Sequence, residues 1–99
     1  MIVTWSQEAD ENLVDIEDFI ARDSVERAVQ FVDALIDHTE AILTDNPKSG
    51  RAVPEIGNPD FREIIYRGYR IVYRLNGDRI DILTVFEGHR LLRLNESGD

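Results

Sequence analysis

Hydrophobic positions follow two different periods along the chain, and the change falls at Pro47. Before Pro47, apolar residues recur every three or four positions, as they do on the buried side of an amphipathic helix. Ser6 and Ser24 each stand at the start of such a stretch, where a hydroxyl can accept a hydrogen bond from a free backbone amide. The pattern predicts a helix that ends near Ala21 and a longer helix over residues 25–43.

After Pro47, apolar and polar residues alternate, which is typical of strands. The alternating stretches cover residues 61–66, 69–75 and 80–86, after a connecting loop over residues 46–60. Residues 2–5 are β-branched or aromatic and predict a strand at the start of the chain. The predicted fold class is therefore α+β: an N-terminal strand, an antiparallel helical hairpin and a three-stranded antiparallel meander that completes one small sheet. We expect a single domain over residues 1–99.

Alternation also assigns the side chains of the last two strands to two faces. One face is almost wholly apolar and should pack on the helices; it comprises Tyr69, Ile71, Tyr73, Leu75, Ile80, Ile82, Thr84 and Phe86. The other face mixes charged and apolar side chains; it comprises Arg70, Val72, Arg74, Asp81, Leu83 and Val85. A sheet rarely offers such a mixture to water without a reason, so this mixed face is the candidate functional surface.

Charge decides between two possible turns in the last hairpin. A turn at residues 76–77 would place Arg74 opposite Arg79, whereas a turn at residues 77–78 places Arg74 opposite Asp81. We therefore expect the second turn.

The preceding turn decides where Arg62 lies. A three-residue turn over residues 66–68 places Arg62 on the mixed face with Arg70 and Arg74, although it turns Glu63 inward. A two-residue turn would send Arg62 to the helix-covered side, where an unpaired guanidinium is costly. The three-residue turn is therefore the expected one.

Composition limits the function. The net charge of −9 argues against general nucleic-acid binding, and we expect no sequence-specific DNA binding by this chain alone. Charge is divided unevenly: residues 1–47 carry two Arg against twelve Asp and Glu, and residues 48–93 carry nine Lys and Arg against six acids. The chain has no Cys, no signal-peptide pattern and no apolar run near the ~20 residues of a membrane span, so we expect a cytoplasmic protein that contacts no membrane.

Metal and cofactor sites are not expected. His38 lies among acids on the longer helix but has no second His within reach, which favours a solvated surface position. The chain also lacks a glycine-rich phosphate loop of the P-loop or dinucleotide type.

The order of elements, together with three short motifs, resembles the RelE/ParE toxin superfamily of bacterial type II toxin-antitoxin modules. The motifs are PKSGRAVPE before the meander, GYRIVYR in its middle strand, and an Arg after the last strand in ILTVFEGHR. The resemblance covers nearly the whole chain. It implies a toxin neutralised by a cognate antitoxin, ParD-like or similar, and directed either at DNA gyrase, as in the ParE type, or at ribosome-bound mRNA, as in the RelE type.

The resemblance also assigns roles to individual residues. If the chain is a nuclease, Arg70 falls on the sheet arginine that orients phosphate, Arg90 on the arginine that stabilises transition-state charge, and Arg62 on a basic position of the adjoining strand. His89 is the remaining candidate for proton transfer. However, Ile64 stands where the RelE type has a Lys, and no Tyr follows Arg90. The resemblance leaves open whether the chain is an enzyme, and the missing groups favour the ParE type.

Two other interpretations remain open at this level. Arg70 and Arg74 could simply pair with neighbouring acids, as arginines on sheet surfaces commonly do. The chain could also be an inert remnant that binds its antitoxin and has no target.

The helices can cover only one side of the sheet, so something else should cover the mixed face. Leu91, Leu92 and Leu94 could cover part of it. We expect an antitoxin segment to cover the rest. The expected antitoxin- or target-binding residues are Arg70, Val72, Arg74, Leu83, Val85, Arg90 and Leu91.

Overall fold

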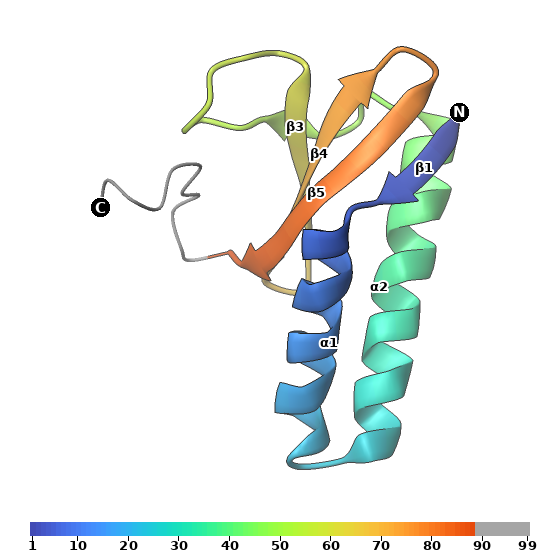
Figure 1. Ribbon diagram of the computed structural model, residues 1–99, viewed down its shortest axis with the longest axis vertical. Helices are drawn as coiled ribbons and strands as arrows, with labels where there is room; N and C mark the ends of the chain where they lie inside the picture. The colour runs from blue at the N-terminus through green and yellow to red at the C-terminus, as the bar shows by residue number, and fades with distance from the viewer. Residues whose placement is uncertain (89–99) are drawn as a thin grey trace.

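The computed structural model describes residues 1–88, and the chain runs through one strand, two helices and four further strands (Figure 1). The elements are β1 (Ile2–Trp5), α1 (Gln7–Ala21), α2 (Val25–Asp45), β2 (Arg51–Ala52), β3 (Phe61–Tyr66), β4 (Tyr69–Asn76) and β5 (Arg79–Glu87). The α+β class is confirmed, and every predicted helix and strand is present within two residues of its expected ends. Strand β2 was not predicted, because a two-residue strand inside a loop shows no alternation.

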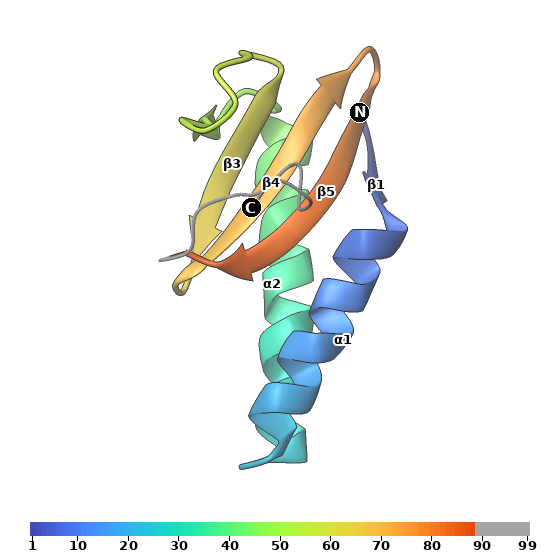
Figure 2. The same cartoon turned by 60° about the vertical axis from the view of Figure 1, so that its left-hand side comes forward.

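The strands form one mixed sheet in the order β1-β5-β4-β3-β2. β1 runs parallel to β5, and the other neighbours are antiparallel. Figures 1 and 2 show both helices on the same side of this sheet, while the loop between β2 and β3 lies on the opposite side. We call the side away from the helices the outer face. None of the helices within residues 1–88 is long and apolar enough to cross a membrane.

Serine hydroxyls begin both helices, as expected. Ser6 accepts from the Ala9 N–H at 3.0 Å, and Ser24 accepts from the Arg27 N–H at 3.2 Å. The Ser6 hydroxyl also donates to the Leu83 carbonyl at 2.9 Å. The cap of α1 therefore also fixes the start of this helix against β5.

A β-bulge interrupts the alternation in β5. Thr84 lies opposite Val72, but the next pair is Ile82 with Tyr73, so Leu83 is an extra residue. One extra residue exchanges the two faces of a strand. Val85 consequently lies in the core with 2% of its surface exposed, and Phe86 lies opposite Arg70. The prediction that Val85 shares the mixed face was wrong, as was the placement of Thr84 and Phe86 on the helix-packed face.

The bulge coincides with the end of β1. Beyond Trp5 no strand within residues 1–88 flanks β5 on the edge away from β4, and the first helix bonds to this edge instead. The Asn12 amide oxygen accepts from the Val85 N–H at 2.9 Å and from the Thr84 hydroxyl at 3.0 Å. The last part of β5 is therefore held by β4 on one edge and by α1 on the other.

The turn between β3 and β4 has two residues, not three. Tyr66 pairs with Tyr69, and both turn residues have positive φ, 48° for Arg67 and 88° for Gly68. This register places Arg62 opposite Tyr73 and Glu63 opposite Val72. Arg62 therefore does not share a face with Arg70 and Arg74, and the expected three-residue turn was wrong. In the next hairpin, the predicted turn at Gly77-Asp78 is confirmed, with Arg74 opposite Asp81.

Tyr73 joins the sheet to residues 46–50, which we call the loop before β2. Its fully buried hydroxyl donates to the Pro47 carbonyl at 2.8 Å and accepts from the Gly50 N–H at 3.0 Å. Burial raises the pKa of this hydroxyl, so it stays protonated and can donate. A Cβ on Gly50 would lie 2.6 Å from this oxygen and 2.6 Å from the Glu63 carbonyl, which leaves room only for glycine.

Tyr73→Phe should lower the free energy of unfolding by about 1–3 kcal/mol, because the Gly50 N–H and the Pro47 carbonyl lose their partner. Chemical denaturation followed by circular dichroism measures this. Tyr66→Phe is the matched control, since the Tyr66 hydroxyl makes no hydrogen bond within residues 1–88. Equal losses for the two variants would contradict the role of the Tyr73 hydroxyl.

Val85→Glu should prevent folding, because it places a carboxylate in the core without a partner. Ile65→Glu should leave the fold intact, since Ile65 lies on the outer face with 49% of its surface exposed. Thermal unfolding of both variants tests the bulge. A well-folded Val85→Glu protein would show that the face assignment in β5 is incorrect.

Candidate functional site

Arg70 lies at the centre of the outer face, with only 4% of its surface exposed. Its Nε donates to Glu63 Oε1 at 2.7 Å. Its two terminal nitrogens donate to the two carboxylate oxygens of Glu55, each at 2.9 Å. The guanidinium carbon also lies 5.0 Å from the centre of the Phe86 ring. Each nitrogen of the arginine thus donates to a carboxylate.

Glu63 extends this arrangement to the edge of the sheet. Its side chain is fully buried, and its second oxygen accepts from Arg51 Nε at 2.7 Å. We call the four residues Arg51, Glu63, Arg70 and Glu55 the ion network. Two guanidinium groups and two carboxylates give it no net charge.

The ion network also fixes the pKa and the position of its central cation. The pKa of Arg70 is raised by hydrogen bonds, first to Glu55 and also to Glu63, although burial opposes this. Arg70 therefore stays charged, and its charge is already balanced by these two groups. Since Glu55 lies in the loop between β2 and β3, the bidentate pair also holds this loop against β4.

The other predicted residues of the outer face are less closely connected. Val72 is buried there opposite Glu63, and Leu83 is half-buried in the bulge. Arg74 is exposed, with its guanidinium carbon 5.6 Å from the centre of the Phe61 ring.

Asp81, which lies opposite Arg74, binds other partners. Its carboxylate accepts from Arg79 at 2.7 Å and from Asn76 at 3.1 Å. These bonds, that with Arg79 foremost, lower the pKa of Asp81. Among residues 1–88, Arg74 forms no ion pair and remains available to a partner.

Arg62 lies on the opposite side of the sheet. It donates to the Gly50 carbonyl at 2.9 Å and to the Lys48 carbonyl at 3.4 Å, while its buried Nε has no partner among residues 1–88. The loop before β2 supplies these carbonyls, which offset the cost that made this position look unfavourable. His89, Arg90 and Leu91 lie outside the described residues. Of the four arginine and histidine positions implied for a nuclease, the two that are described therefore point to opposite faces.

Sequence reasoning did not place Glu55, Glu63, Arg51 and Phe86 in the site. Glu63 gave a signal, because the expected turn forced this glutamate inward, which is a costly place for a carboxylate. Glu55 gave none, since nothing in a loop sequence shows that the loop folds across the sheet.

The described residues give no sign of a metal centre: within residues 1–88, no group of three or more His, Asp and Glu side chains could hold an ion. His38 is half-buried, and its ring lies 4.7 Å from the centre of the Tyr66 ring. The expected solvated position for His38 was therefore wrong.

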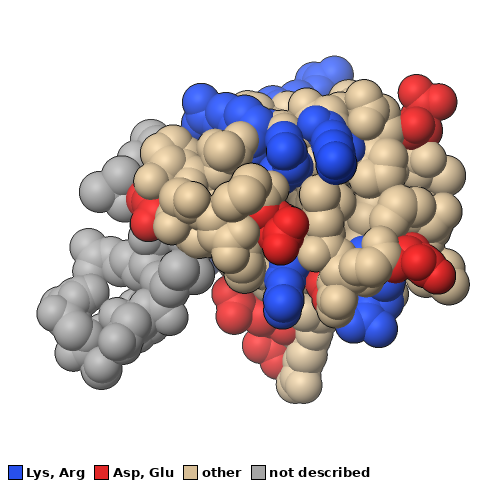
Figure 3. Space-filling view, turned by 90° about the horizontal axis from the view of Figure 1, so that it is seen from above, with Lys and Arg blue, Asp and Glu red and all other residues tan. Residues whose placement is uncertain are grey.

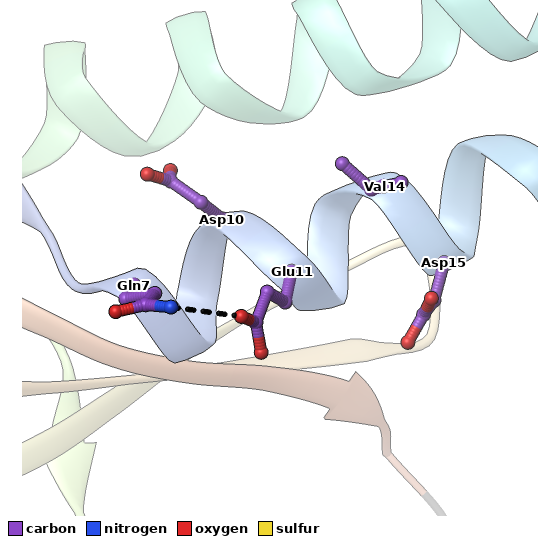
Figure 4. A pocket seen from close by; sticks show the side chains of 5 residues that line it. All are labelled: Gln7, Asp10, Glu11, Val14 and Asp15. Atoms are coloured by element: carbon purple, nitrogen blue, oxygen red, sulfur yellow. Dashed lines mark hydrogen bonds between the residues drawn. The ribbon is translucent and has the colours of Figure 1, made fainter.

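One cavity of about 240 Å³ lies along α1 and is lined by Gln7, Asp10, Glu11, Val14 and Asp15 (Figure 4). All five residues come from a single helix, and Gln7 donates to Glu11 at 3.1 Å. No group from another element converges on this cavity, so it does not form a chemical site.

Comparison with known proteins gives a similar structure and a matching family. The small mixed sheet with a helical hairpin on one face is similar to a chain in a solved structure of the chromosomal ParDE toxin-antitoxin system from P. aeruginosa. That chain matches with a TM-score of 0.73 and 22% identity, over 88% of this chain and 95% of that one. The family model of the ParE toxin of the type II toxin-antitoxin system parDE matches residues 3–92. The chain therefore belongs to the ParE toxin family, which implies an antitoxin partner. A search of curated proteins gave no match.

Arg70→Ala should lower the free energy of unfolding by about 3–5 kcal/mol, because it leaves buried Glu63 and the Glu55 carboxylate without their central cation. Arg51→Ala should cost less than about 1 kcal/mol, since 63% of that side chain is exposed. Equilibrium unfolding in urea compares the two. A stable Arg70→Ala protein would show that the ion network does not support the fold.

Proposed function

We propose that this toxin inhibits DNA gyrase in the cytoplasm and is neutralised by a ParD-like antitoxin that docks on the outer face of the sheet. The observation that carries this proposal is the ion network, which buries and neutralises the arginine that a nuclease would use. A surface of this kind suits protein docking, because it offers shape and local polarity without a free catalytic group.

Nuclease chemistry fits the described residues poorly. Cleavage of RNA needs groups that transfer protons and others that stabilise charge on the phosphate. Arg70 is committed to Glu55 and Glu63, and Arg62 lies on the other face. An ionised carboxylate pair around Arg70 would also repel a phosphate. The ribosome-dependent nuclease therefore remains only as the alternative.

The outer face offers contacts suited to an antitoxin. Exposed Ile65 lies opposite Arg70, and exposed Arg74 lies beside Phe61. An antitoxin segment can place apolar side chains against Ile65 and half-buried Leu83, and an acid against Arg74. Val72 lies on the outer face and Val85 lies in the core on the helix side, and both are nearly fully buried, so neither offers much surface to a partner. Contacts through Arg90 and Leu91 remain part of the proposal.

The purified toxin should abolish DNA supercoiling by gyrase and leave mRNA intact in a ribosome-containing translation extract. Addition of the cognate antitoxin should restore supercoiling. Gel assays of plasmid topology and of message length provide the two readouts.

Arg74→Glu should weaken the antitoxin complex without unfolding the protein, because it reverses an exposed charge that forms no ion pair within residues 1–88.

The three interpretations give different results in this experiment. Cleaved messages with normal supercoiling would establish the nuclease instead. An unaffected gyrase, intact messages and normal growth after expression without antitoxin would identify an inert remnant. Both results would overturn the gyrase proposal.

A further inference from the structure

The loop before β2 lies at the surface, yet several side chains hydrogen-bond to its backbone. The Asn46 side-chain oxygen accepts from the Lys48 N–H at 3.1 Å. The buried Tyr73 hydroxyl bonds both Pro47 and Gly50, and Arg62 donates to the carbonyls of Lys48 and Gly50. Three side chains from α2's C-cap, β3 and β4 thus fix a short loop.

The side chains that this loop presents are polar or cationic and face solvent. Lys48, Ser49 and Arg51 are all exposed. Lys48 forms no ion pair within residues 1–88, whereas Arg51 is paired with Glu63. A cation on a backbone that is already fixed costs less conformational entropy when it binds a partner. The arrangement therefore suits recognition of an anionic group beside Lys48.

A cavity opens next to Lys48. It measures about 490 Å³ and is lined by Met1, Asn46, Pro47, Lys48, Asp60, Leu75 and Gly77. Met1, Pro47 and Leu75 supply apolar walls, and Lys48 and Asp60 supply opposite charges. The cavity can take an apolar side chain, while an accompanying carboxylate should lie on the Lys48 side, away from Asp60.

We propose that Lys48 and this cavity form a second docking site for the antitoxin, separate from the outer-face ion network. The occupant is an antitoxin segment that inserts an apolar side chain between Met1, Pro47 and Leu75 and places a carboxylate against Lys48. The inference rests on the proposed function only in taking the antitoxin as the partner. It does not depend on which target the toxin has.

Two features favour a protein segment over a nucleic acid. An apolar cavity accepts an aliphatic or aromatic side chain, which a phosphodiester backbone does not offer. A long polyanion would also meet the twelve Asp and Glu of residues 1–47, whereas a short acidic segment confines its charge to the loop. Figure 3, which views the molecule from above, shows several Lys and Arg side chains along one edge and others elsewhere on this view, with Asp and Glu side chains between them.

A matched pair of charge reversals tests the site. Lys48→Glu reverses the proposed contact, and Arg27→Glu makes the same change of charge at an exposed position in the first turn of α2 that forms no ion pair within the described chain. Isothermal titration with the purified cognate antitoxin should show at least about tenfold weaker binding for Lys48→Glu, roughly 1.4 kcal/mol, and less than about twofold for Arg27→Glu. Both variants should keep the wild-type unfolding temperature. A short DNA duplex is titrated in parallel and should not bind any of the three proteins.

Two other titration results would contradict the proposed docking site at Lys48. Equal antitoxin affinities for the two variants would show that Lys48 makes no specific contact. Binding of the duplex that is lost only in Lys48→Glu would assign the loop to nucleic acid instead. Failure of gyrase inhibition alone would leave this result unaffected, because antitoxin affinity is measured without the target.

Discussion

The Arg70 guanidinium links side chains of three neighbouring strands and of one loop across the outer face. It joins β4 to the neighbouring strand through Glu63 and to the loop after β2 through Glu55, and it covers Phe86 of β5. A buried cation is tolerated only when its donors are satisfied, and here two carboxylates satisfy them. The same pairing gives every nitrogen of the Arg70 guanidinium a carboxylate partner. The structure of the outer face therefore depends on this one interaction.

Two irregularities decide what the sheet presents. The bulge at Leu83 turns Val85 into the core and Phe86 toward Arg70, and the two-residue turn at Arg67-Gly68 brings Glu63 to the outer face. Without the bulge, Phe86 would face the helices, and without the two-residue turn, Glu63 would face them. The ion network is thus a consequence of strand register as much as of residue type.

Electrostatics separate the protein into regions with different uses. The helices carry most of the negative charge, the ion network of the outer face is balanced, and Lys48 in the loop before β2 forms no ion pair within residues 1–88. A balanced face can be desolvated by a protein partner at lower cost than a strongly charged one. This distribution supports the proposed docking of an antitoxin on the outer face.

The sequence by itself determined the elements and their order, because hydrophobic period and serine caps are local properties. It also determined the last turn, since Arg74 opposite Asp81 is favoured over Arg74 opposite Arg79. The family could be inferred from short motifs such as GYRIVYR. The tertiary structure alone decided which face each outer residue occupies. The Asn12 oxygen that binds β5 beyond its bulge comes from α1, and the carbonyls that accept from Arg62 come from the loop before β2. A register depends on such partners, and the alternation of a single strand does not contain them.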